Sequence, residues 1–251
     1  MQEQDRLLQK RLLDLSRRAY MRRCYTNTEF LTMAEQDALR RTAFDDNCAP
    51  VELFGGFEGA ERRVARFGSE QLCGYDDMMP ISCVRIAPAA QKFADALTHR
   101  DFLGALLSLG VRRGVLGDIV LSENSGHLFC LESIAGFIVE ELRQVRRTTV
   151  TCTVLEETPE LVSAEPEEKS VNVASGRLDG VAAAVFKLSR SDAQALFKEG
   201  KVSVNSRLVE NTSFQPEHGD VVSVRGYGRF VFEGVSGSSR KGRLYVTVRV
   251  Y

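Results

Sequence analysis

The sequence predicts an α+β fold of three domains, and three patterns along its 251 residues support that prediction. Residues 79–155 follow the order strand, helix, strand, strand, helix, strand, which is the split βαβ arrangement of ferredoxin-like folds. Residues 175–251 begin with two short amphipathic helices and continue as alternating strands. Residues 156–174 are acidic and contain two prolines, which is typical of a linker. Residues 1–78 would then form an N-terminal helical and α/β domain.

The N-terminal domain begins with a predicted helix over residues 2–23, where leucines recur at helical spacing between many charged residues. Arginines crowd the end of this helix, where they complement the helix dipole or contact a nucleic acid. Thr32 and Glu35 have the spacing of a capping box, so they predict the start of a second helix near residues 33–42.

A glycine-rich segment follows at residues 55–59, with the sequence Gly-Gly-Phe-Glu-Gly. As a nucleotide-binding loop it lacks the Walker lysine pattern, and the acidic Glu58 would oppose a phosphate. We therefore predict a structural turn between a strand and a helix. Glu61, Arg62 and Arg63 would lie on the exposed face of that helix.

The central domain is predicted from its order of apolar patterns. The expected elements are strands over 81–87, 118–122, 128–132 and 148–155, and helices over 98–109 and 133–143. RNA-recognition modules share this topology and stack bases on aromatic side chains of the two central strands. Here the first strand has no aromatic residue and the hairpin strand has only Phe129. We interpret this domain as a scaffold or spacer that lacks the usual stacking platform.

His99, Arg100 and Asp101 lie next to one another in this domain, and such residues could serve acid–base catalysis. Adjacent residues on a helix point to different faces, however, so they do not form one constellation. We expect helix capping and surface charge instead.

The C-terminal domain opens with a predicted helix over residues 178–186. Ser189 and Asp192 have the spacing of a second helix start, and Gly200 would end that helix. A strand over residues 201–205 follows. The side chains left for solvent are mostly basic or polar, and they comprise Arg177, Lys187, Ser189, Arg190, Ser191, Gln194, Lys198, Lys201 and Asn205.

Arg190 and Ser191 fall in the first turn of the second helix, beside its unpaired backbone N–H groups. A helix N-terminus with a guanidinium and hydroxyls nearby suits phosphate oxygens. Further cations come from Arg225 and from a later loop that carries Arg240, Lys241 and Arg243. A solvated basic face on an ordinary helical hairpin is the alternative that these residues leave open.

The charge is unevenly distributed along the chain. The net charge is −1, but residues 176–251 hold 12 lysines and arginines against 7 acidic residues, which gives +5 and leaves −6 for the rest. A basic C-terminal module on an acidic body suggests that this end of the chain meets a polyanion.

Composition excludes several other classes. No run of about 18 apolar residues is present, so we expect no membrane span, and the polar N-terminus argues against a secretory signal. Cytoplasm is therefore the expected location. Six cysteines without a Cys-x-x-Cys pair and three scattered histidines predict buried free thiols, no metal site and no cofactor. Without a heptad run, we expect a monomer.

A set of motifs in fixed order resembles the αL RNA-binding motif, or S4 domain. They are Arg177-Leu178-Asp179, Leu188-Ser189-Arg190-Ser191, the segment 200–205 and Gly219-Asp220-Val221-Val222. The resemblance covers roughly residues 175–251. It implies RNA binding by the helical pair, with matching positions at Arg177, Ser189, Arg190, Ser191, Gln194, Lys198 and Lys201. We expect Asp179 to orient Arg177 or cap its helix rather than contact RNA.

A second resemblance spans nearly the whole chain. Residues 54–62, 97–106, 109–113 and 116–119 are similar to the bacterial YlmH-type family. That resemblance implies a ribosome-associated RNA-binding protein without known catalysis. It also implies, as partners, large-subunit ribosomal RNA and tRNA. The family is linked to ribosome-associated quality control on obstructed peptidyl-tRNA, where it supports C-terminal alanine tailing.

Two rival functions follow from the same residues. Residues 176–179, Gly-Arg-Leu-Asp, resemble the short motif of some pseudouridine synthases, in which the aspartate is catalytic. Only 72 residues follow Asp179, too few for a separate catalytic domain, and no adenosylmethionine-type glycine loop is present, so we do not expect an enzyme. A cell-division interaction protein ranks third, since no basic amphipathic membrane helix is evident.

Overall fold

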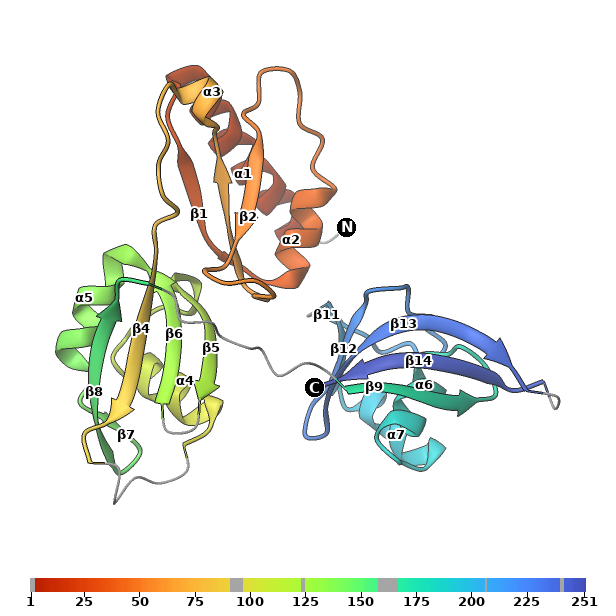
Figure 1. Cartoon of the computed structure of the whole chain (residues 1–251). Helices are drawn as coiled ribbons and strands as arrows, with labels where there is room; N and C mark the ends of the chain where they lie inside the picture. The colour runs from red at the N-terminus through yellow and green to blue at the C-terminus, as the bar shows by residue number, and fades with distance from the viewer. Residues whose placement is uncertain (1–2, 91–96, 123–124, 158–166, 206, 240–241) are drawn as a thin grey trace. The chain divides into compact units, whose positions relative to one another are not determined.

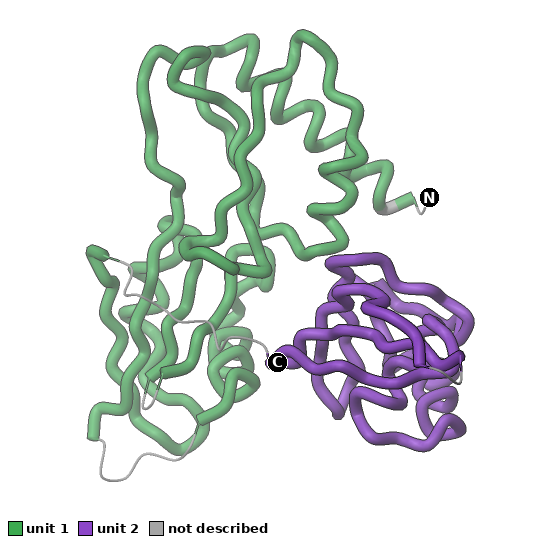
Figure 2. The backbone as a smooth tube through the Cα atoms, turned by 45° about the vertical axis from the view of Figure 1, so that its right-hand side comes forward, with its two compact units in different colours: residues 1–163 green, residues 164–251 purple. Residues whose placement is uncertain are grey.

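The computed structural model describes residues 3–90, 97–122, 125–157, 167–205, 207–239 and 242–251. The chain forms two compact units, residues 1–163 and residues 164–251, which Figure 2 distinguishes by colour. Each is a mixture of helices and antiparallel sheet, and each is described here by itself. The first unit contains both the N-terminal and the central regions, which share a buried contact.

The N-terminal region is a three-stranded antiparallel sheet with helices packed against it (Figure 1). Its elements are α1 (Glu3–Arg22), β1 (Thr26–Leu31), α2 (Met33–Arg40), β2 (Val51–Phe54), β3 (Arg63–Phe67) and α3 (Glu70–Cys73), with strand order β1-β3-β2. Leu12 of α1, Leu39 of α2 and Phe67 of β3 meet in its core. The predicted capping box is confirmed, because the Glu35 carboxylate accepts the Thr32 backbone N–H at 2.7 Å.

The glycine-rich segment follows a strand, as predicted, but the prediction that a helix comes after it is wrong. Residues 55–62 connect two strands, not a strand and a helix, and Arg63 begins β3 rather than lying on a helix face. The reason is non-local: β3 pairs with both β1 and β2 and is the central strand of the sheet, so Val64 and Phe67 are fully buried. Such long-range pairing overrides the local helical pattern.

The central region has the predicted order of strands and helices. Its elements are β4 (Ile81–Pro88), α4 (His99–Ser108), the 3-10 turn Arg113–Val115, β5 (Leu116–Ser122), β6 (Ser125–Leu131), α5 (Glu132–Glu141), β7 (Gln144–Val145) and β8 (Thr148–Leu155). The antiparallel sheet has the order β5-β6-β4-β8-β7. Both helices pack on one face of it, where Val84, Ile86, Phe102, Leu106 and Ile138 form the core.

The opposite face of the central sheet is covered by the N-terminal region. Phe129 of β6 is fully buried, and the Phe57 ring stacks on it with ring centroids 4.7 Å apart. Phe30 of β1 and Cys83 of β4 belong to the same apolar cluster. The two regions of the first unit are therefore joined across the sheet face that RNA-recognition modules leave open.

Polar contacts reinforce this junction. The Asp118 carboxylate accepts the backbone N–H groups of Glu61 and Arg62 at 2.6 and 3.3 Å. The Arg62 guanidinium donates to the carbonyl oxygens of Leu116 at 2.9 Å and Phe30 at 2.8 Å. Burial lowers the pKa of Arg62, an effect that the carboxylates of nearby acidic residues oppose. Arg62 thus ties the glycine loop to both sheets, instead of lying on an exposed face.

The C-terminal unit is a six-stranded antiparallel sheet with two helices on one side (Figure 1). Its elements are β9 (Glu167–Val173), α6 (Leu178–Val185), α7 (Arg190–Lys198), β10 (Val202–Val204), β11 (Arg207–Leu208), β12 (Val221–Val224), β13 (Gly228–Ser238) and β14 (Leu244–Val250). The order is β11-β10-β12-β13-β14-β9. Leu178, Phe197, Phe230 and Val246 lie in its core.

Residues 167–173 correct the extent of the predicted linker. They form the edge strand β9, which pairs with β14 from Glu167–Val250 to Val173–Leu244. The acidic side chains hid this strand from the sequence pattern, yet charged residues are common on exposed edge strands because they discourage pairing with other chains. Residues 158–166 of the expected linker lie outside the described residues.

We predict that Gly56→Ala destabilises the first unit by about 2–4 kcal/mol. Gly56 has φ +101°, and a Cβ there would lie 2.2 Å from the Phe129 ring. Urea unfolding followed by circular dichroism measures the change. The control is Gly104→Ala in α4, where a Cβ meets nothing within 4 Å and alanine favours the helix. Equal stability of Gly56→Ala and the unmodified protein would contradict the packing described here.

Candidate functional site

A buried carboxylate organises the polar surface of the α6–α7 hairpin. Asp179 of α6 has no exposed area, and it accepts hydrogen bonds from Arg177 at 3.2 and 3.1 Å. It also accepts from the Gln194 amide at 3.1 Å and from the Gly180 backbone N–H at 2.9 Å. The Arg190 Nε lies 3.7 Å from the same carboxylate. Two guanidinium groups and one side-chain amide, from α7 and from the residue before α6, thereby surround one anion.

The predicted role of Asp179 in orienting Arg177 is confirmed by these hydrogen bonds. Burial pushes the pKa of Asp179 upward, but the hydrogen bonds from Gln194 and Arg177 outweigh it, so the pKa lies below its ordinary value. Asp179 is therefore ionised near neutral pH and acts as an acceptor. The outer parts of the arginines stay accessible: 33% of the Arg177 side chain and 57% of the Arg190 side chain are exposed.

The sequence predicts unpaired backbone N–H groups at the start of α7, but one of them is paired in the structure. The Ser189 hydroxyl accepts the Asp192 backbone N–H at 3.1 Å and donates to the Asp192 carboxylate at 2.6 Å. The Ser191 hydroxyl lies 2.8 Å from that of Ser189. The cap that the sequence predicted is confirmed, but it occupies one of the N–H groups and places an acidic residue beside the expected phosphate site. Of the groups predicted to bind phosphate at this helix start, Arg190 is the one that carries a positive charge.

The other predicted basic residues lie along the edges of the hairpin. Lys187 is exposed in the turn between the helices, with left-handed φ of 54°, and Lys198 is exposed at the end of α7. Lys201 forms an ion pair with Glu199 at 2.6 Å. The exposed Arg225 lies beside Lys201, because its backbone N–H donates to the Lys201 carbonyl at 2.8 Å.

Asn205 serves the fold rather than an open surface. Its side chain donates to the Asp220 carboxylate at 2.7 Å and accepts the Val221 backbone N–H at 2.9 Å. The nitrogen and the oxygen of the Asn205 side-chain amide are thus both engaged within the turn that follows β10. Arg240 and Lys241 lie outside the described residues, so their assignment stays a prediction.

Sequence reasoning missed the way that Arg243 is held. Its guanidinium donates to the Asn172 side chain and, at 2.8 Å, to the Asn172 backbone carbonyl. Asn172 belongs to β9, so the pairing could not be foreseen while that segment was interpreted as a linker. The alternation of Val171 and Val173 was the only sequence signal for this strand.

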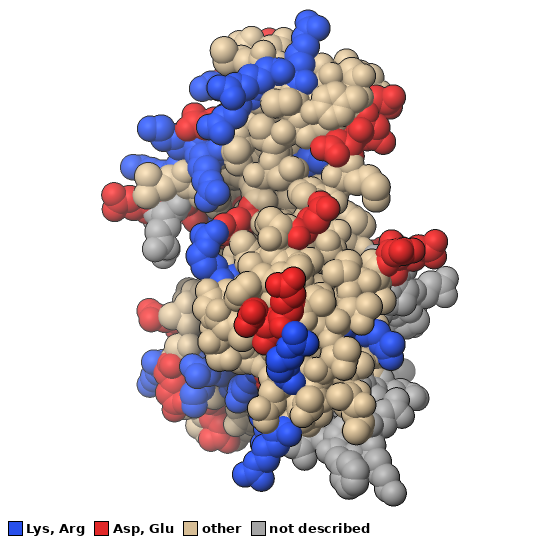
Figure 3. Space-filling model, turned by 90° about the vertical axis from the view of Figure 1, so that its left-hand side faces the viewer, with Lys and Arg blue, Asp and Glu red and all other residues tan. Residues whose placement is uncertain are grey.

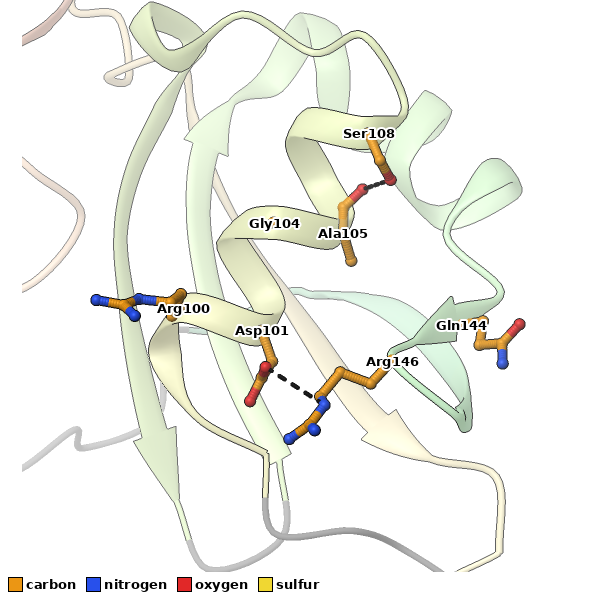
Figure 4. A pocket seen from close by; sticks show the side chains of 7 residues that line it. All are labelled: Arg100, Asp101, Gly104, Ala105, Ser108, Gln144 and Arg146. Atoms are coloured by element: carbon orange, nitrogen blue, oxygen red, sulfur yellow. Dashed lines mark hydrogen bonds and ion pairs between the residues drawn. The ribbon is translucent and has the colours of Figure 1, made fainter.

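The first unit offers a polar pocket of about 500 Å³ on α4 and the β7 turn (Figure 4). Asp101 accepts from the Thr98 backbone N–H at 2.9 Å and lies 3.7 Å from the Arg146 Nε. The Arg100 side chain points away from both in Figure 4. The hydrogen bonds of Asp101 agree with the predicted capping role, and the Arg100 side chain does not meet the Asp101 carboxylate at a shared point.

The surface of the N-terminal region is mixed in charge. In the upper part of Figure 3, basic side chains gather at one edge of the face and acidic ones at the other. Within the described residues no helix is long and apolar enough to cross a membrane. The same residues contain no group of three His, Cys, Asp or Glu side chains that could hold a metal ion.

Three of the six cysteines are buried, as predicted, and three are partly exposed. Burial raises the pKa of Cys130 to about 12 and that of Cys83 and Cys152 to about 11. These three thiols are protonated near neutral pH, which suits core packing and not nucleophilic chemistry.

Comparisons with known proteins agree on one family. A family model described as "Putative RNA-binding domain in YlmH" matches residues 80–159. The chain is 30% identical over 221 residues to the ribosome-associated protein quality control protein P2 of Bacillus subtilis (strain 168), covering 88% of this chain and 85% of the relative. The solved structure of the cell division protein ylmH from Streptococcus pneumoniae superposes with a TM-score of 0.53 at 14% identity, over 64% of this chain and 97% of that one. At that identity the structure supports the fold alone.

We predict that Asp179→Asn destabilises the α6–α7 hairpin by about 2–4 kcal/mol, because arginines and an amide lose their shared anion. The folded-state pKa of Asp179 is lowered, so its stabilisation is present above the unfolded pKa and is lost as pH falls through the folded pKa. The variant should therefore lose less stability than the unmodified protein as the pH falls below about 4, the ordinary pKa of an aspartate.

Hydrogen exchange of peptides from residues 177–198, under increasing urea, measures the loss of stability in Asp179→Asn and locates it within the α6–α7 hairpin. The exposed Asp192→Asn is the matched control in the same hairpin, and it should cost about 1 kcal/mol or less. Unchanged exchange in Asp179→Asn would show that the carboxylate does not organise the hairpin.

Proposed function

The chain belongs to the YlmH family, and on that premise we propose that it binds structured RNA through the α6–α7 hairpin, as an S4-type module. The observation that carries the proposal is the pair of arginines held by the buried Asp179. Arg177 and Arg190 are fixed at their inner sides and accessible at their outer sides. Guanidinium groups that are already positioned lose less entropy when they meet phosphates.

The proposed RNA is helical rather than single-stranded. A-form duplexes hide their base edges in a deep, narrow groove, so proteins recognise them through backbone shape and phosphates. Lys187, Lys198 and Arg225 would add phosphate contacts around the two arginines. The +5 charge of residues 176–251 supports this electrostatic mode.

We extend the proposal to the ribosome because the B. subtilis relative is described as a ribosome-associated quality control protein. In this proposal the chain acts in the cytoplasm as a monomer. It binds large-subunit ribosomal RNA and tRNA and supports C-terminal alanine tailing on obstructed peptidyl-tRNA.

The proposal for the central region is a ferredoxin-like RNA-binding domain that does not use base stacking on its sheet. The family model assigns RNA binding to residues 80–159, whereas Phe129 is buried beneath Phe57. RNA contact through this domain would come from its helices or loops, with the N-terminal region as a structural cover.

Catalysis of the pseudouridine synthase type is not part of the proposal. A catalytic aspartate must reach the uridine, but Asp179 has no exposed area and is bonded to Arg177, Gly180 and Gln194. Its environment suits a structural anion. Tritium release from RNA that contains labelled uridine would overturn this conclusion.

We predict that Arg190→Glu weakens RNA binding about tenfold and reduces the slope of log affinity against log salt by about 1. The reason is the loss of one phosphate contact and the addition of a repelling charge. Fluorescence anisotropy with a labelled RNA hairpin, measured over a KCl series, gives both quantities.

The matched control is Lys169→Glu, which makes the same charge change on β9 of the same unit. Circular dichroism confirms that both variants are folded. If Arg190→Glu and Lys169→Glu lower the affinity equally at every salt concentration, the hairpin is no specific binding surface and only net charge matters.

A further inference from the structure

The C-terminal unit contains a pocket that the proposed RNA surface does not account for. It has a volume of about 320 Å³ and lies between the end of β9, one side of α6 and the start of α7. Ala183, Ala184 and Leu188 form an apolar wall. Arg190 and Arg243 lie at the same pocket, and they come from elements far apart in the sequence.

Both arginines contact other groups of the fold, Arg243 through hydrogen bonds and Arg190 through an ion pair. Arg243 donates to the side chain and the backbone carbonyl of Asn172, and Arg190 lies 3.7 Å from the buried Asp179. Both side chains belong to exposed residues. Among the described lining residues none is acidic, so the pocket has a cationic side and an uncharged wall.

On the α6 side the pocket is lined by residues with little side chain, Gly180, Ala183 and Ala184. A Cβ added to Gly180 would meet only the Ser175 carbonyl oxygen, at 3.9 Å, and Ala183 is not part of the core cluster. A flat ring could therefore lie against α6 without displacing core side chains. The volume falls at the small end of the range for ligand pockets, about 300–1,000 Å³. That size fits one nucleotide and is too small for a duplex.

We propose that this pocket binds a single unpaired nucleotide of the RNA that the hairpin contacts. The base would lie against the wall formed by Ala183 and Leu188, and its phosphate would meet Arg190 and Arg243. Unpaired bases in loops and bulges are the parts of RNA that proteins read individually, by stacking and hydrogen bonds. The inference rests on the proposed function and adds a preference for helices interrupted by a bulge.

Two RNA hairpins that differ only by one bulged nucleotide test this directly. Fluorescence anisotropy with the full-length protein measures both dissociation constants, with A, C, G or U at the bulge in turn. We expect at least one bulged hairpin to bind about tenfold more tightly than the paired hairpin, which corresponds to about 1.4 kcal/mol. Ala183→Leu fills the pocket and should abolish that preference while leaving affinity for the paired hairpin unchanged.

Arg243→Gln is the second variant, and it keeps the test open if Ala183→Leu does not fold. It should reduce the bulge preference at least threefold. Its control is Arg249→Gln in β14, the strand that begins directly after Arg243. This change removes the same charge from a residue that pairs with Glu233 and does not line the pocket. This control should keep the full preference.

The outcomes separate the pocket from the function on which it rests. Equal binding of bulged and paired hairpins by the unmodified protein would overturn the pocket proposal alone. Failure to bind either hairpin at low salt would overturn the proposed function and the pocket with it. If AMP or UMP binds and Ala183→Leu abolishes that binding, while the two RNA hairpins bind equally, the occupant is a free nucleotide. The proposal of a bulged RNA nucleotide in the pocket is then wrong, and the proposed function stands.

Discussion

A buried carboxylate must be surrounded by donors, because an unpaired charge in the interior costs several kcal/mol. Asp179 meets this requirement with Arg177 before α6, Gly180 within it and Gln194 on α7. The same contacts fix how the two helices meet, and they direct guanidinium groups to the surface. One acidic residue therefore gives the hairpin both its internal geometry and its basic face.

The junction within the first unit uses a related arrangement. Asp118 receives two backbone N–H groups of the glycine loop, while Arg62 donates to carbonyl oxygens on both sheets. Phe57 is thereby placed on Phe129, and Gly56 is required because no side chain fits at that approach. Residues 54–62 and 116–119, two of the segments that resemble the family, are the two sides of this junction.

Local signals in the sequence predicted much of the fold. The helix starts predicted from a pair of side chains three residues apart are found at Thr32 and Ser189, and the helix predicted from residue 98 is capped there by Asp101. The strand Thr148–Leu155 was also predicted, since its β-branched run needs no distant partner to be recognised. The candidate site was predicted in part: the exposure of Arg190 follows from helical spacing, and the role of Asp179 in orienting Arg177 was expected together with the resemblance to the αL motif.

Apart from the N–H group capped by Ser189 at the start of α7, the failures concern contacts between residues that are distant in sequence. β1 and β9 contain polar or acidic side chains and become strands only through their partners β3 and β14. Arg62 looked like a surface residue because its acceptors Phe30 and Leu116 lie 32 and 54 residues away in the sequence. Arg243 was expected to be one of several loop cations, and its position beside Arg190 depends on Asn172 of β9. No periodicity along one segment contains that information.

The central claim is that RNA meets the hairpin around Asp179 and not the central sheet. Ultraviolet cross-linking of the full-length protein in cells, with mass spectrometric identification of the cross-linked peptides, tests it most directly. The account predicts RNA adducts on peptides from residues 177–201 and none on the peptide that contains the buried Phe129. Adducts on Phe129, with an unmodified hairpin, would show that the sheet opens to RNA and would contradict the account.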